Sequence, residues 1–185
     1  MVIYMKAIET ALSLTQAYKL GIERFEKMLG NEFAKAVESM NNSSTHIIVC
    51  GMGKSGLVGR KISSTLASTG TPSIFLHPAE AIHGDLGKVQ KNSVVLLISY
   101  SGETGEIIAL IPALKRLDVN IIALTGVKNS TLANISDIVL DTSVDREACP
   151  LNLAPTTSTM ITMVLGDALA AVSYTHLTLP TTAYV

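Results

Sequence analysis

The chain contains no tryptophan, and aromatic residues make up only 4% of its 185 residues. Charged residues are also few, at 16%, and the 14 Lys and Arg side chains nearly balance the 15 Asp and Glu. A surface that binds nucleic acid needs an excess of positive charge and aromatic rings on which bases stack, so the composition argues against nucleic acid as a partner. Hydrophobic residues reach 48%, which is typical of a single folded domain with a large core and excludes a disordered chain.

Cysteines and long apolar runs are scarce as well. The two cysteines, Cys50 and Cys149, lie far apart in the sequence, which predicts a reduced protein without a disulfide framework. The longest apolar stretch, 160–172, is interrupted by Gly166 and Asp167 and is too short and too polar to span a bilayer. The first residues do not combine a charged segment with a long apolar core, so we do not expect them to act as a secretory signal. We therefore expect a cytoplasmic protein that does not interact with a membrane.

The hydrophobic pattern predicts an α/β domain with helices on both faces of a parallel sheet. Apolar residues recur every three or four positions over 7–40 and predict a helical segment with a break at Gly30-Asn31. Continuous apolar runs predict five strands, at 45–50, 73–76, 94–99, 119–124 and 138–140. Between and after them the pattern predicts helices over 55–68, 103–117 and 156–172. Strands that alternate with helices in this way form a three-layer αβα architecture.

Residues 1–172 account for this domain, and 173–185 form an atypical tail without a helical period, to which we assign no function. In a parallel sheet, ligands bind beyond the carboxyl ends of the strands. Four predicted loops share that edge, namely 51–56, 77–87, 99–106 and 125–130.

The loop 99–104 predicts a phosphate site. It carries the hydroxyl groups of Ser99, Ser101 and Thr104, follows a buried strand and leads directly into a helix. A helix start offers unpaired N–H groups and a partial positive charge, both of which attract anions. Because the loop contains no Lys or Arg, we expect it to hold a phosphoester by hydrogen bonds and the helix dipole.

The loop 51–56 matches the pattern G-x-G-x-x-G between a predicted strand and a predicted helix. A dinucleotide site also needs an acidic residue at the end of the next strand, but the first carboxylate there is Glu80. A Walker loop would need a glycine at Ile48. A nucleotide cofactor therefore remains only an alternative, and the loop is better explained as a tight turn that presents Lys54.

Three carboxylates and one histidine complete the set of candidates. We expect Glu103 to stabilise the helix start that follows it, whereas Glu106 lies close enough to that start to face a bound ligand. Glu147 precedes the last helix, and His83 lies in the loop 77–87. Alone, each is typical of a solvated charge, and no cysteine or histidine spacing indicates a zinc site.

Together, four segments resemble a sugar isomerase (SIS) domain of the arabinose-5-phosphate isomerase type. They are Gly51-Met-Gly-Lys-Ser-Gly56, His77-Pro-Ala-Glu-Ala-Ile-His-Gly-Asp-Leu-Gly87, Ser99-Tyr-Ser-Gly-Glu-Thr104 and Glu147-Ala-Cys-Pro-Leu-Asn-Leu-Ala-Pro-Thr-Thr-Ser-Thr159. The resemblance implies a flavodoxin-like five-stranded parallel sheet and a homotetramer. It also implies interconversion of D-arabinose 5-phosphate and D-ribulose 5-phosphate through an enediolate, without a metal or a cofactor.

Carried over residue by residue, the resemblance implies a division of the site into two parts. Ser55, Ser99, Ser101 and Thr104 would bind the phosphate, and the reacting end of the sugar would meet Lys54, His83, Glu106 and Glu147. Lys54 would stabilise the negative oxygen of the intermediate. His83 and the two glutamates remain equal candidates for the acid and the base.

Similar proteins commonly add a pair of CBS domains and place a further histidine shortly past the last helix, where it completes the site of a neighbouring subunit. This sequence diverges from that pattern at about Ser173, and His176 does not fit it. We therefore expect a domain that folds and binds sugar phosphate but turns over slowly. Two alternatives stay open, a binding module that senses a sugar phosphate without converting it, and an isomerase for another substrate such as hexulose 6-phosphate.

Overall fold

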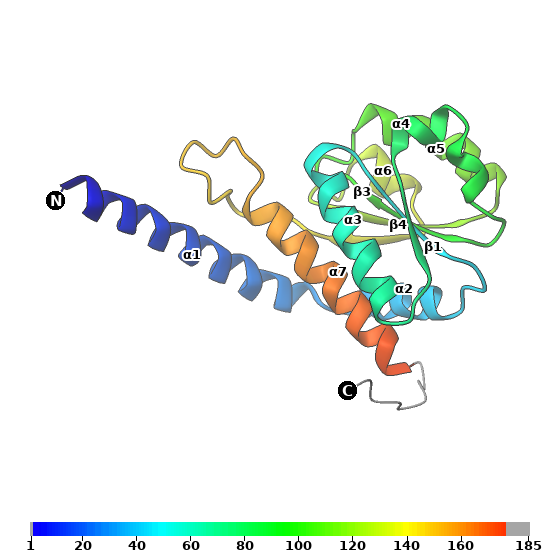
Figure 1. The fold of residues 1–185 in the computed structure, drawn as a ribbon, viewed down its shortest axis with the longest axis horizontal. Helices are drawn as coiled ribbons and strands as arrows, with labels where there is room; N and C mark the ends of the chain where they lie inside the picture. Colours follow the sequence, from blue (N-terminus) through cyan, green and yellow to red (C-terminus); the bar gives the residue numbers. More distant parts are fainter. Residues whose placement is uncertain (1, 177–185) are drawn as a thin grey trace.

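The computed structural model describes residues 2–176 of the chain, and the side chains of residues 5–173. At its centre is a sheet of five parallel strands in the order β2-β1-β3-β4-β5 (Figure 1). The strands are β1 (Ile47–Gly51), β2 (Ser73–Leu76), β3 (Val94–Ile98), β4 (Asn120–Thr125) and β5 (Ile138–Asp141). This is the strand order of a flavodoxin-like fold, so the predicted sheet is confirmed.

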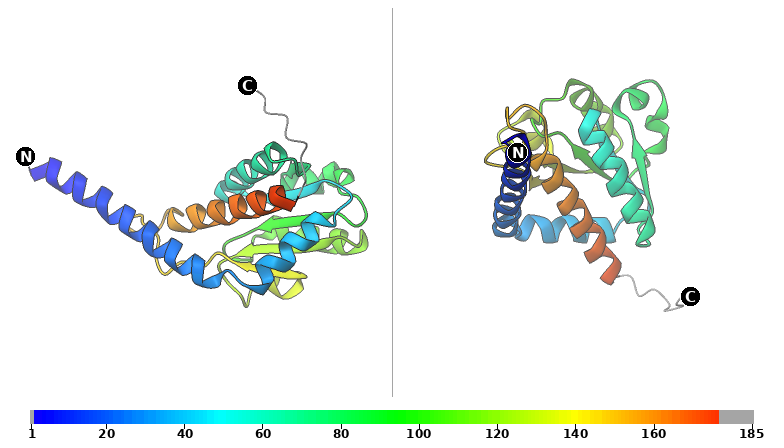
Figure 2. Two further views of the ribbon diagram at one scale, coloured as in Figure 1. Left: turned by 90° about the horizontal axis from the view of Figure 1, so that it is seen from below. Right: turned by 60° about the vertical axis from the view of Figure 1, so that its left-hand side comes forward.

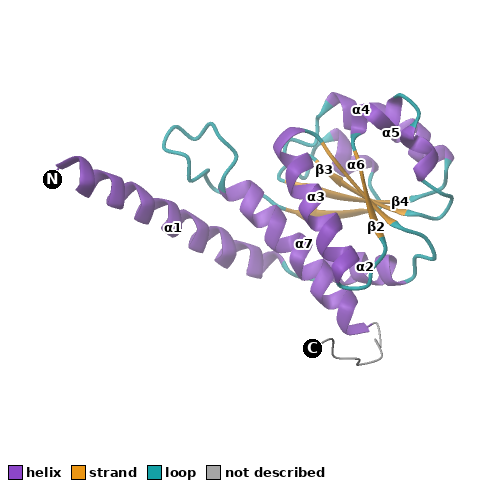
Figure 3. Ribbon diagram, viewed as in Figure 1, coloured by secondary structure: helices purple, strands orange, loops and turns teal. Residues whose placement is uncertain are grey.

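Helices cover both faces of the sheet, as Figure 3 shows. The helices are α1 (Val2–Met28), α2 (Asn31–Asn41), α3 (Gly53–Ser68), α4 (Pro78–Ile82), α5 (Gly105–Arg116), α6 (Thr131–Ile135) and α7 (Thr157–His176), and a short 3-10 helix spans Asp85–Lys88. Alternate strand residues face opposite sides: Val49 packs with α2, α3 and α7, whereas Ile48 packs with α4, α5 and α6. Because both faces of the central strands β1, β3 and β4 are buried, these strands lack polar residues at alternate positions, which explains their continuous apolar runs.

The N-terminal helical segment breaks at Gly30 as predicted, and α1 extends away from the rest of the domain (Figures 1 and 2). Ala17, Gly21 and Phe25 are buried at four-residue spacing, and α1 contacts α7. A Cβ on Gly21 would lie 2.9 Å from Cγ2 of Thr157, so the glycine allows the two helices to approach closely. Other faces of α1 leave large apolar side chains exposed, namely Met5, Ile8, Leu12, Leu20 and Ile22.

Several boundaries differ from the prediction. The last helix continues to His176, four residues past its predicted end, so the start of the predicted tail is helical. The rest of that tail, 177–185, lies outside the described residues. Short helices occupy parts of the chain that were predicted as loops or were not assigned, because Pro78 and Ser130 provide favourable helix starts that a search for long periodic patterns overlooks.

Candidate functional site

The loop 99–104, called here the phosphate loop, is a closed turn between β3 and α5. Ser99 is 2% exposed, and its Oγ lies 2.8 Å from Oγ1 of Thr104 and accepts a hydrogen bond of 3.1 Å from the N–H of Gly102. Gly102 has a φ of 66°, and a Cβ there would lie 2.0 Å from Oγ of Ser130. Only glycine fits this position, so the chain conformation that gathers the hydroxyl groups depends on it.

The phosphate loop ends at the N-terminus of α5. Thr104 is the N-cap residue but makes no side-chain hydrogen bond to the helix. Its hydroxyl is directed to Ser99 instead. The first N–H groups of this twelve-residue helix are therefore left without a side-chain acceptor. The arrangement provides neutral donors and the positive end of a helix dipole at one place, which suits an anion such as a phosphate.

Glu103 makes a side-chain hydrogen bond to a helix other than the one that it precedes. Its Oε1 accepts a hydrogen bond of 2.6 Å from the N–H of Thr131, the first residue of α6. The structure therefore gives Glu103 a helix-start role at α6, which was not predicted, and its effect on the dipole of α5 stays a prediction. The sequence could not show this, because Thr131 is distant in the chain and approaches Glu103 only through the packing of the two turns.

Lys54 and Ser55 lie in the first turn of α3, where Lys54 is exposed and Ser55 is half-buried. A Cβ on Gly56 would lie 2.6 Å from the carbonyl oxygen of Gly51, so this turn requires glycine at that position. Gly51 lies opposite Ile98 in the parallel register of β1 and β3. Consequently the turn that presents Lys54 begins beside the phosphate loop, as the sequence predicts.

His83 and Glu106 lie on two helices that pack against each other. His83 is exposed at the C-terminal end of α4, and Glu106 is half-buried in the first turn of α5. α4 follows β2, the edge strand next to β1. These two side chains therefore lie at the carboxyl ends of the strands, at the same end of the sheet as Lys54.

Glu147 approaches from the opposite side, beyond β5. Its Oε2 accepts hydrogen bonds from the N–H of Thr156 at 2.6 Å, from the hydroxyl of Thr156 at 3.1 Å and from the N–H of Ser158 at 3.3 Å. The carboxylate thus caps the N-terminus of α7. Partial burial acts to raise the pKa of Glu147, but the hydrogen-bond donors of Ser158 and Thr156 outweigh it and lower the pKa. The group stays ionised and is a weak proton acceptor.

A cavity of about 330 Å³ connects Glu147 to the phosphate loop. Tyr100 and Glu147 both line it, together with Arg146, Asn152 and Ser158. Lys54, His83 and Glu106 do not line it. Sequence reasoning overlooked Tyr100, although a large aromatic side chain stands out in a loop of small residues.

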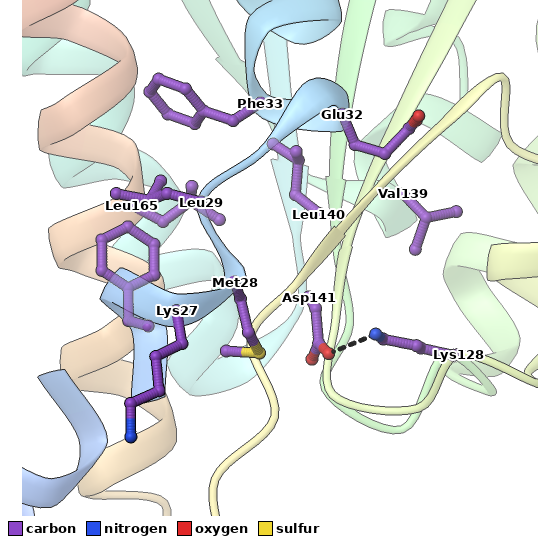
Figure 4. Close-up of a pocket in the computed structure, with 11 residues that line it drawn as sticks. Lys27, Met28, Leu29, Glu32, Phe33, Lys128, Val139, Leu140, Asp141 and Leu165 are labelled. Atoms are coloured by element: carbon purple, nitrogen blue, oxygen red, sulfur yellow. Dashed lines mark ion pairs between the residues drawn. The ribbon is translucent and has the colours of Figure 1, made fainter. Parts of the chain in front are cut away.

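A second cavity, of about 440 Å³, lies under the junction of α1 and α2 and is shown in Figure 4. Lys128 and Asp141 form an ion pair of 3.0 Å on one wall, and the opposite wall is mainly apolar. Burial acts to raise the pKa of Asp141, but hydrogen bonds from Ser143 and the ammonium of Lys128 lower it overall. None of the predicted site residues lines this cavity.

Two features are absent from the described part of the chain. No group of three or more His, Cys, Asp and Glu side chains is placed there so that it could hold a metal ion. Among its helices, none combines the length and the apolar character that crossing a bilayer requires.

Comparison with known proteins gives a consistent result. A family model described as "SIS domain" matches residues 39–172. Arabinose 5-phosphate isomerase KdsD of Pseudomonas aeruginosa is 56% identical over 142 residues, which cover 77% of this chain and 44% of that protein. Arabinose 5-phosphate isomerase KpsF of Escherichia coli O6:H1 is 53% identical over 150 residues, which cover 80% of this chain and 46% of that protein. The chain thus spans less than half the length of these relatives.

A solved structure gives the same indication over most of the chain. The protein c3406 of E. coli CFT073, in complex with arabinose 5-phosphate, has a TM-score of 0.85 and 37% sequence identity. The match covers 93% of this chain and 92% of that chain.

Proposed function

Because the chain belongs to the SIS-domain family, we propose that it is an aldose–ketose isomerase that interconverts arabinose 5-phosphate and ribulose 5-phosphate. The observation that carries this proposal is the phosphate loop, in which Ser99, Ser101 and Thr104 surround the start of α5 beside the turn of Lys54. The names of the relatives and the arabinose 5-phosphate complex of a structural neighbour support the choice of substrate.

The proposed reaction moves one proton between two carbons of the open-chain sugar. A base removes the proton from C2 of the aldose, and the electrons form a C1–C2 double bond while the carbonyl oxygen O1 becomes negative. The ammonium of Lys54 stabilises that oxygen. Return of the removed proton to C1 and transfer of the C2 hydroxyl proton to O1 then give the ketose, so atoms and charge balance without a redox partner.

The acid and base belong to the set His83, Glu106 and Glu147. The contacts of Glu147 with α7 favour a fixed negative charge at that position, because a carboxylate with a lowered pKa takes up a proton reluctantly. His83 and Glu106 are then the better candidates for proton transfer. This assignment keeps Ser55 with the phosphate group, next to Lys54 in the first turn of α3.

The direct test is incubation of the protein with arabinose 5-phosphate in D₂O. We expect ribulose 5-phosphate to form and deuterium from the solvent to enter the sugar at the carbon that receives the proton. Unphosphorylated arabinose is the control and should not react measurably. If the sugar phosphate raises the melting temperature but is not converted, the domain is a binding module and the isomerase proposal fails.

We also propose that the protein is a cytoplasmic homotetramer. The exposed apolar side chains of α1, such as Ile8 and Leu12, are suited to packing against another copy. In an assembly of this kind a neighbouring subunit could complete a site that one chain leaves open. Light scattering after gel filtration measures the mass, and a monomer would contradict this part of the proposal.

A further inference from the structure

The residues 143–147, called here the Glu147 segment, connect β5 to the loop before α7 without helix or strand structure. In Figure 1 this loop lies between α1 and the sheet. A segment without regular hydrogen bonding is held by individual contacts, and each contact then influences where Glu147 lies. Two side chains from different parts of the chain supply such contacts.

Tyr100 holds the Glu147 segment from the phosphate loop. Its hydroxyl accepts a hydrogen bond of 3.3 Å from the N–H of Val144. Its ring is so close to Gly126 that a Cβ there would lie 2.4 Å from the ring carbon Cε2. The N–H of Gly126 also donates a hydrogen bond of 2.9 Å to the carbonyl oxygen of Tyr100. The turn after β4 therefore fixes both the ring and the main chain of Tyr100.

Arg24 holds the same segment from α1. Its Nη2 donates to Oγ of Ser143 at 3.0 Å, and its Nη1 lies 2.5 Å from Oδ1 of Asp145. Arg24 follows Gly21 by three residues, so it lies next to the point where α1 packs closely on α7. The guanidinium thus starts from a fixed helix and reaches the segment on both sides of Val144.

We propose that Tyr100 and Arg24 are positioning residues for Glu147, an inference that rests on the proposed isomerase function. The two contacts fix Val144 and its neighbours, and Glu147 follows Val144 by three residues. Tyr100 and Glu147 also line the same cavity of about 330 Å³. Tyr100 and Arg24 act through the segment: they determine where the Glu147 carboxylate lies and do not transfer a proton themselves.

The kinetic test uses Tyr100→Phe, which keeps the ring, and Arg24→Gln, which removes the charge. Tyr100→Phe deletes one hydrogen bond, and Arg24→Gln deletes a hydrogen bond and an exposed ion pair, so we expect kcat to fall roughly three- to tenfold in each variant. KM should stay within about twofold, because the hydroxyl groups of the phosphate loop are unchanged. Arg24→Lys should restore part of kcat. As matched controls, Tyr18→Phe and Arg116→Gln should leave kcat unchanged.

A second measurement does not depend on activity. Arg146 is exposed within the Glu147 segment, so trypsin cleavage after it reports how often the segment opens. We expect cleavage at Arg146 to accelerate roughly three- to tenfold in Tyr100→Phe and in Arg24→Gln. Cleavage at Lys91 should not change, because Tyr100 and Arg24 make their contacts to the Glu147 segment and not to the chain around Lys91.

The outcomes separate this inference from the proposed function. If the wild-type protein does not convert arabinose 5-phosphate, the proposed function fails, and the cleavage rates still decide whether the two side chains hold the segment. Unchanged cleavage at Arg146, or equal acceleration at Lys91, would overturn the inference. If the wild-type protein is active and Tyr100→Phe and Arg24→Gln keep its kcat, the inference is also overturned.

Discussion

Glu147 accepts a hydrogen bond of 2.6 Å from the N–H of Thr156, which immediately precedes the first residue of α7. This contact joins a predicted active-site carboxylate to a helix start nine residues later in the chain. The helix dipole and the donors of Thr156 and Ser158 favour the ionised form. The carboxylate of Glu147 therefore has two roles: it stabilises α7, and it places a negative charge beside the cavity.

Glu147→Gln tests both roles. We expect the free energy of unfolding to fall by about 1–2 kcal/mol, because the neutral amide loses the charge-assisted hydrogen bonds and the attraction of the carboxylate to the helix dipole. We also expect kcat to fall. Urea unfolding measures the first effect. Glu38→Gln on α2 is a matched control, since this exposed side chain lies near the amino ends of the strands, away from Glu147. An unchanged free energy of unfolding would contradict the capping role.

The stability effect of Glu147 should depend on pH in a defined direction. Its pKa is lowered by folding, so its contribution is present above the ordinary value of 4.5 and is lost as the pH falls through the lower folded pKa. The stability difference between wild type and Glu147→Gln should therefore shrink on acidification below that value. A difference that grows in acid would mean that the carboxylate is not stabilised in its charged form.

Thr104→Val tests the phosphate loop, because it keeps the shape of the side chain and removes its hydroxyl group. A hydrogen bond to a charged phosphate contributes about 1.5–3 kcal/mol, so KM for the sugar phosphate should rise by roughly one to two orders of magnitude. Thr104→Ser retains the hydroxyl and should restore most of the affinity. Equal KM values for the valine and serine variants would exclude this hydroxyl from binding.

Gly102→Ala tests whether the turn itself gathers the hydroxyl groups. The φ of 66° and the predicted clash with Ser130 should destabilise the protein by about 1–3 kcal/mol and weaken the binding of the sugar phosphate. Gly87→Ala is the control, because a Cβ there meets no atom within 4 Å. If both variants unfold at the same urea concentration, the conformation of Gly102 does not control the turn.

The sheet could be predicted from the sequence because its three central strands, β1, β3 and β4, are buried on both faces. Val94–Ile98 and Asn120–Thr125 are nearly unbroken apolar runs, and helical periodicity separates them. The short helix after Ser130 was not found, since five residues are too few for a periodic pattern. α7 extends past its predicted end for a related reason: polar and β-branched residues follow Val172, and such residues are typical of the end of a helix.

The candidate site was predicted only in part. Ser99 and Thr104 lie within six residues of each other, so their grouping could be derived from local sequence. The contact of Tyr100 with Val144 joins positions 44 residues apart, and that of Arg24 with Asp145 spans 121. Contacts of this kind arise from the packing of strands and helices, and a single sequence carries no pattern that indicates them.

Lys54→Ala gives the sharpest test of the chemistry. Lys54 is exposed in the first turn of α3, so its removal should leave the free energy of unfolding nearly unchanged. Loss of a donor to a developing oxyanion lowers kcat by about two to three orders of magnitude, and KM should change far less. Lys91→Ala is a matched control, since this exposed lysine precedes β3 at the amino edge of the sheet. A kcat equal to that of the wild type would remove Lys54 from the mechanism. If Lys54 is the charged donor to the oxyanion, its loss must raise the energy of the intermediate and slow the reaction.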